Sequence, residues 1–148
     1  MDADAVTRGV ASTRRTPIDE VPSVAGIMLL VALLKLALVV AGFERIWRWI
    51  REHAQRAPLR GDVDPVLVTK TEYAVAMAAA LYPGRAQCLE RSLLLYWYLR
   101  RRGVAVRYRM GVQMYPFMAH AWIEWHGQPI NDVPEHVRRF RPIEGVAT

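Results

Sequence analysis

The only cysteine of the chain, Cys88, begins an apolar run at 88–103, CLERSLLLYWYLRRRG, whose composition is typical of a helix. A thiolate at the start of a helix meets free backbone N–H groups and the positive end of the helix dipole, and both lower its pKa. Nucleophilic cysteines are often placed in this way. Free cysteine is also among the most buried residue types. Position alone therefore leaves two interpretations open, a nucleophile or an inert buried thiol.

A histidine and an aspartate with complementary chemistry follow the cysteine. His120 lies in MAHAWIEW at 118–125, which predicts a strand, and Asp132 ends a short third strand predicted from about Gln128. An aspartate can hold one nitrogen of an imidazole and orient the ring. The other nitrogen is then free to accept a proton from a thiol. The three residue types together indicate acyl transfer through a thiolate.

The register of these two strands decides whether His120 and Asp132 meet. With a three-residue loop at 125–127 and Gly127 in the left-handed position, the two residues stand directly opposite each other. Their Cβ atoms would then be about 4.5–5.5 Å apart on one face of the hairpin. A two-residue loop would place Asp132 on the opposite face. The predicted contact therefore depends on a single turn.

The other histidines have ordinary interpretations. His53 and His136 lie in polar surroundings and are expected at the surface, and His126 is expected in a turn. A zinc site would have to be assembled from Cys88, the histidines and scattered acidic residues without any recognisable spacing. We therefore expect neither a metal nor another cofactor.

The elements that must position these residues begin with an apolar segment at 23–56. Between Val24 and Phe43 the only charge is Lys35. About 20 apolar residues are enough to cross a bilayer, whereas a lysine at the centre of a span costs about 2.5–3.5 kcal/mol. Two interpretations stay open, a long helix buried against the rest of the domain and membrane contact through residues 24–50.

The helical run continues past Phe43 as a basic amphipathic helix, whose apolar residues share a face that is expected in the core: Ile46, Trp49 and Ile50. A further helix is predicted over 69–81, capped by Thr69 or Thr71. In the helix that Cys88 begins, Glu90 in the first turn complements the dipole, and Gly103 follows the predicted end.

Composition limits the remaining possibilities. The chain has 148 residues, enough for one domain, which we place at 23–148 after a flexible polar tail at 1–22. One cysteine cannot form an internal disulfide and fits a reducing compartment, so a cytoplasmic location is expected. The net charge is +6, but the arginines are scattered and no nucleic-acid motif is present, so we expect no nucleic-acid partner.

Two strings, CLERSLLLYWYLRRRGV and GVQMYPFMAHAWIEWHGQPIND, resemble the leader peptidases of lasso-peptide biosynthesis, which carry a microcin-processing, transglutaminase-like domain. The resemblance is strong over 82–132, the expected catalytic core, and weaker over 23–56. It implies an α+β papain-type fold, in which N-terminal helices, with the cysteine at a helix N-terminus, pack on a small antiparallel sheet. It further implies that Cys88 is the nucleophile, His120 the general base and Asp132 the residue that orients it.

The resemblance also implies a function. Such a peptidase removes the leader from a ribosomally made precursor peptide, usually with a separate leader-binding partner protein, and a macrolactam synthetase then closes the released core. In that chemistry the main-chain N–H of Cys88 and the side chain of Gln87 are candidate donors to the oxyanion. Two alternatives remain: transfer of the acyl group to an amine by the same triad, and a non-catalytic, membrane-associated binding module.

Overall fold

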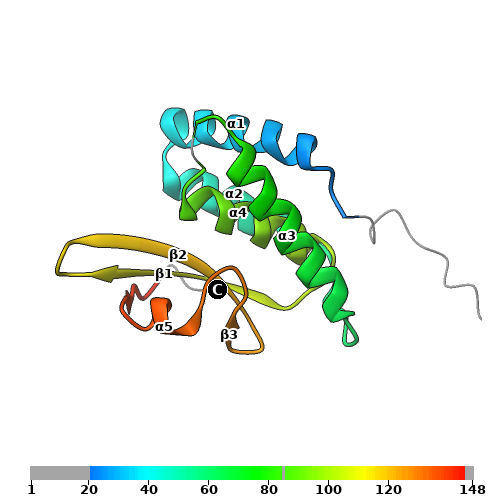
Figure 1. Cartoon of the computed structure of the whole chain (residues 1–148). Helices are drawn as coiled ribbons and strands as arrows, with labels where there is room; N and C mark the ends of the chain where they lie inside the picture. Colours follow the sequence, from blue (N-terminus) through cyan, green and yellow to red (C-terminus); the bar gives the residue numbers. More distant parts are fainter. Residues whose placement is uncertain (1–20, 85, 146–148) are drawn as a thin grey trace, which may run out of the picture.

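The chain is divided into a layer of helices and a small antiparallel sheet (Figure 1). The computed structural model describes residues 21–84 and 86–145. The helices are α1 (Val24–Ala41), α2 (Phe43–Ala54), α3 (Pro65–Leu81), α4 (Cys88–Arg101) and α5 (Pro134–Val137). The strands are β1 (Val106–Gln113), β2 (Met118–Trp125), β3 (Gln128–Pro129) and β4 (Arg141–Pro142). The predicted α+β class is confirmed, while the predicted tail, up to residue 20, lies outside the described residues.

Gly42 divides the helical run that was predicted to be continuous over 23–56. Its φ of 79° lies in the left-handed region, which glycine enters without a Cβ penalty. Its N–H still donates to the carbonyl of Leu38 at 3.1 Å and so completes the last turn of α1. The chain then turns back, so that α2 and α4 lie between α1 and the sheet (Figure 1).

The expectation that α1 is buried holds for one side only. Ile27, Val31 and Leu34 are buried against the other helices, and Lys35 on the same side forms an ion pair with Glu90 of α4 at 2.8 Å. The remaining face of α1 is exposed and apolar. By length and composition α1 is the one helix among the described residues that could cross a membrane.

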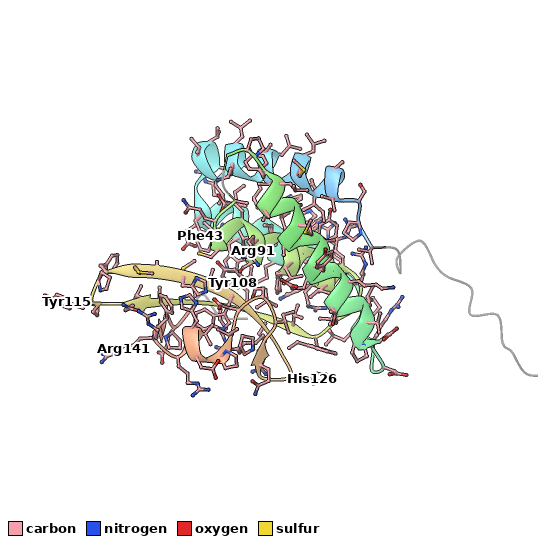
Figure 2. The ribbon with its side chains drawn as sticks, in the orientation of Figure 1. Phe43, Arg91, Tyr108, Tyr115, His126 and Arg141 are labelled. Atoms are coloured by element: carbon pink, nitrogen blue, oxygen red, sulfur yellow. The ribbon has the colours of Figure 1, made fainter. Side chains whose placement is uncertain are left out.

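The core-facing residues of α2 differ from those predicted. Trp47, Ile50 and Ala54 are buried, whereas Trp49 is 51% exposed. The Trp47 ring contacts Tyr96 of α4 at 5.2 Å between centroids and Tyr108 of β1 at 4.6 Å. Trp47 therefore joins the helical layer to the sheet, and Figure 2 shows Tyr108 between them.

Helix α3 begins four residues before the predicted start. Asp64 caps it by accepting a hydrogen bond from the N–H of Val66 at 2.9 Å, and Pro65 occupies the first helical position, where its missing N–H costs nothing. The predicted caps lie inside the helix. Thr69 and Thr71 each donate to a carbonyl four residues earlier instead.

The sheet has the strand order β3-β2-β1-β4, and each neighbouring pair is antiparallel. The three-residue loop predicted between β2 and β3 is wrong. The turn consists of His126 and Gly127, whose φ angles of 50° and 75° suit the tight two-residue turn that fits a twisted hairpin. Trp125 therefore pairs with Gln128, and β3 ends at Pro129 rather than at Asp132.

Candidate active site

Cys88 is the first residue of α4, and a hydrogen-bonded cap fixes this start. Gln87 takes an extended conformation, with a φ of −84° and a ψ of 175°, and its N–H donates to Glu90 Oε2 at 2.9 Å. The other carboxylate oxygen of Glu90 accepts from Lys35 Nζ at 2.8 Å. Glu90 is buried, so the lysine of α1 supplies the counter-charge that a buried carboxylate needs. The helix begins at the cysteine because of these bonds.

The His120 side chain reaches the half-buried Cys88 thiol from β2 and lies close enough to change its pKa. Burial raises the pKa of the thiol. The hydrogen bond and charge of His120, with backbone N–H groups of Ala121 and Leu89, outweigh burial and lower the pKa below its ordinary value. The pKa of His120 is raised by the Cys88 hydrogen bond and, against burial, by Asp132. Both directions favour a thiolate beside an imidazolium.

Asp132 meets His120 although the predicted register is wrong. The distance from His120 Nε2 to Asp132 Oδ2 is 2.5 Å, which leaves Nδ1 of the ring for the thiol. Burial raises the pKa of Asp132, but hydrogen bonds from His136, the Val133 N–H and His120 together lower it. The carboxyl group is therefore ionised at neutral pH and can hold a charged imidazole.

The contact with Asp132 is possible because the chain leaves the sheet after Pro129. The N–H of Ile130 donates to the carbonyl of Ile123 at 3.0 Å, and Asn131 Oδ1 then accepts from the Ile123 N–H at 2.8 Å. The Asn131 side chain thus replaces the strand partner that β2 would otherwise have. This side-chain bond turns the backbone so that Asp132 returns to the face that carries His120.

A second group of hydrogen bonds joins α4, β2 and the segment after β3, at positions next to the three candidate residues. Ser92, one turn after Cys88, donates to the carbonyl of Ala121 at 2.9 Å and accepts from Asn131 Nδ2 at 2.9 Å. Ala121 follows His120, and Asn131 precedes Asp132. Ser92 is fully buried. Loss of either hydrogen bond would therefore leave a buried polar group without its partner. The sequence signal for this network was a polar residue within an apolar helix stripe.

The ring of His120 is packed between aromatic side chains. Trp122 is stacked at 6.0 Å between centroids, and Phe140 lies at 4.9 Å. Gly111, which pairs with His120 on β1, permits this approach, because a Cβ there would be 2.9 Å from the Phe140 Cβ. The imidazole is therefore held by packing as well as by its hydrogen bonds.

His136 was expected at the surface, and its side chain is 35% exposed, but it also contacts the candidate site. Its Nδ1 lies 2.8 Å from Asp132 Oδ2, the same oxygen that holds His120. The rings of His136 and His120 meet edge to face at 4.9 Å between centroids. The four-residue spacing of Asp132 and His136 was the signal, but the sequence did not indicate that α5 begins between them.

Ligand atoms of His120, Asp132 and His136 lie within 4.8 Å of one another, so these residues could also hold a divalent cation. Such an ion would occupy the nitrogen and oxygen atoms that now form the two hydrogen bonds. Because both imidazoles would lose their proton-bearing positions to the ion, a metal here would oppose proton transfer by His120. The hydrogen-bonded arrangement is the one that suits thiol chemistry.

A family model described as the transglutaminase-like superfamily matches residues 30–145. The match covers most of the chain and includes all the candidate residues. The chain belongs to the transglutaminase-like superfamily. No curated protein and no solved structure shows a significant match. Membership suggests a cysteine peptidase or an acyltransferase, both of which form an acyl-thioester.

Gln87, the second candidate oxyanion donor, has a defined backbone role in this superfamily member. Its main-chain N–H is bound to Glu90, and its side chain is exposed beside the start of α4. The side chain carries an amide N–H₂ group that can donate to an oxyanion. Its participation stays a prediction.

Asp132 is hydrogen bonded to both His120 and His136, and we expect variants of these three residues to lose activity to different degrees. We expect Asp132→Ala to lower kcat/KM by about 10²-fold, less than His120→Ala, because the charge that orients the imidazole is lost. His136→Ala removes one donor, itself partly exposed, and should cost about threefold to tenfold. Kinetics of the three variants beside His53→Ala, a histidine on α2 outside the candidate site, would measure this order. A larger loss in His136→Ala than in Asp132→Ala would contradict it.

Proposed function

We propose that the chain is a cysteine peptidase that removes the leader from a ribosomally made lasso-peptide precursor. The observation that carries the thiol chemistry is the contact of Cys88 with His120, together with the His120–Asp132 hydrogen bond. Superfamily membership supports acyl transfer in general. The choice of a leader peptidase rests on the resemblance of the strings within 82–132.

In the proposed reaction the thiolate of Cys88 attacks the scissile carbonyl carbon and forms a tetrahedral oxyanion. The Cys88 N–H, with Gln87 as a second donor, stabilises that negative charge. The His120 imidazolium gives its proton to the leaving amine as the carbon–nitrogen bond breaks, which leaves a thioester. Water then attacks the thioester, His120 accepts the proton from the water, and the carboxylic acid is released with the thiolate restored.

The surface near His120 offers an apolar contact for a peptide. The hairpin that joins β1 to β2 exposes Met114, Tyr115, Phe117 and Met118, and Figure 2 shows Tyr115 at its free end. Met118 is two residues before His120 on β2. In the proposed function this hairpin contacts the precursor, while a separate leader-binding protein presents the leader and the macrolactam synthetase receives the core.

Mass spectrometry of the products tests this proposal. Wild-type protein, a lasso precursor and its leader-binding protein should yield a free leader and a free core whose summed masses equal the precursor plus one water. Superfamily membership also fits an acyltransferase, and an amide adduct with an added amine would support that function instead. A precursor that stays intact while the Cys88 thiol reacts readily with alkylating reagents would contradict the proposed substrate.

A further inference from the structure

Helix α1 carries an apolar face that nothing in the described part of the chain covers. Its members are 52–85% exposed: Leu29, Leu33, Leu36, Val39 and Val40. Four of them follow at spacings of four, three and four residues and so form one continuous stripe along the helix. A helix that is apolar all round is normally buried in a protein core or in a membrane. We therefore expect the exposed apolar stripe of α1 to be covered by another molecule.

The stripe continues into an apolar groove between the helices. The groove has a volume of about 240 Å³, and its lining includes Leu33 and Ala37 of α1, Ile46 and Trp49 of α2, and Trp97 of α4. Trp49 is stacked on Trp97 at 5.2 Å between centroids, and the Arg101 guanidinium lies 4.9 Å above the Trp97 ring. Arg45 precedes Trp49 by one turn of α2 and is exposed. The edge of the apolar surface thus consists of tryptophans and arginines.

We propose that this face of α1, with the Trp49–Trp97 edge, binds the surface of an anionic membrane. Between Val24 and Ala41 the only polar or charged side chain is Lys35, which the Glu90 ion pair holds on the inner side. A protein interface carries about one hydrogen bond per 100–200 Å², and the outer side chains of α1 offer no group to form one. Lipid needs no such partner.

The inner contacts of α1 favour contact in the plane of the membrane over a span across it. Insertion of α1 across a bilayer would separate Lys35 from Glu90 and would remove Ile27, Val31 and Leu34 from the helices against which they are buried. Leaving the buried Glu90 unpaired is strongly unfavourable. A helix that keeps its inner contacts and inserts its outer side chains among the acyl chains loses none of them.

Arginine and tryptophan side chains beside the apolar face favour an anionic membrane surface. Residues 43–56 carry four arginines against two glutamates, and three more arginines end the run at 100–102. Tryptophan prefers the level of lipid headgroups, and arginines near a membrane surface are attracted to anionic lipid. Figure 1 shows α1 on the side of the helical layer away from the sheet, so a bound protein leaves the hairpin and β2 accessible.

Flotation of the full chain with phospholipid vesicles tests this proposal. Wild-type protein should float with vesicles that contain phosphatidylglycerol and float less with phosphatidylcholine alone. Leu36→Glu/Val40→Glu should lower binding by at least about tenfold, because two inserted side chains become charged. Leu59→Glu/Val66→Glu replaces two other exposed apolar residues with the same change of charge and should bind as the wild type does.

Three results would overturn the proposal. The wild type could fail to float, the Leu36→Glu/Val40→Glu variant could float equally well, or the anionic and neutral vesicles could bind alike, which would remove the role of the arginines. A dimer in solution that Leu36→Glu/Val40→Glu dissociates, without flotation of the wild type, would assign the face to a second copy. Circular dichroism of each variant confirms that the compared proteins are folded.

Discussion

Cys88→Ala is expected to lower kcat by at least about 10⁴-fold, while the protein remains folded. The loss follows because no other cysteine is present to form the acyl-thioester. The fold should survive because the start of α4 depends on the Gln87–Glu90 and Lys35–Glu90 bonds rather than on the thiol. Cleavage of the precursor, followed by mass spectrometry, measures the loss, and thermal unfolding checks the fold.

Cys88→Ser provides the matched control for this result. A serine replaces the thiol with a hydroxyl donor of nearly the same volume, but its oxygen is a far weaker nucleophile at neutral pH. Both variants should therefore be inactive, and the unfolding midpoint of Cys88→Ser should lie close to that of the wild type. Full cleavage by Cys88→Ala would show that the thiol does not act as the nucleophile.

His120→Ala is expected to have the second-largest effect, a loss of about 10²–10⁴-fold in kcat/KM, because the proton donor to the leaving amine is removed. It should also change how the thiol titrates. His120 supplies a hydrogen bond and a charge that lower the pKa of Cys88, whereas burial raises it. Without His120 the pKa of the thiol should rise.

The rate of Cys88 alkylation as a function of pH measures this change directly. Only the thiolate reacts, so in the wild type the rate should increase with pH through a pKa below the ordinary thiol value of about 8.5. In His120→Ala the same rise should occur at higher pH, and the rate at pH 7 should fall. His53→Ala, which removes a histidine of α2 outside the candidate site, should leave the profile unchanged. An identical profile in His120→Ala would contradict the ion pair.

The order of helices and strands up to β3 was predictable because the chain changes its hydrophobic period once, whereas α5 and β4 were not predicted. The strand at 118–125 has the predicted ends, and the helix that begins at Cys88 ends at Arg101, one residue before the predicted end. Gly103 follows α4 with a φ of 79°. The alternation of apolar residues indicated the strand, while Glu90 in the first turn and the arginines in the last turn indicated the helix. These are local signals, and a single sequence contains them in full.

The contact between His120 and Asp132 was predicted for a reason that proved wrong. The turn at His126 and Gly127 is one residue shorter than expected, and a slip of one residue moves every side chain to the other face. Asp132 returns to His120 because the Asn131 side chain bonds the Ile123 N–H. A hydrogen bond between an irregular segment and a strand leaves no periodic signal in the sequence.

The choice between a buried and an exposed α1 stayed open for a different reason. Hydrophobicity predicts that a helix needs an apolar environment, but not whether protein or lipid supplies it. The Lys35–Glu90 pair explains the single charge, and a lysine 55 residues from its partner cannot be matched with it from one sequence. His136 escaped detection similarly, because the start of α5 places it beside Asp132.

The Lys35–Glu90 ion pair also sets a limit on how the protein can be shortened. Removing α1 is an obvious way to improve the solubility of such a chain in the laboratory. A chain cut at Gly42 would lose Lys35 and leave the Glu90 carboxylate without its cation, two residues from the thiol. Such a truncated protein would lack the exposed leucines of α1, yet the surface on which Ile27, Val31 and Leu34 pack would be uncovered and the turn from which Cys88 projects would be weakened. Replacing the outer leucines of α1 by polar residues, with Lys35 kept, is therefore the sounder design for a crystallisable protein.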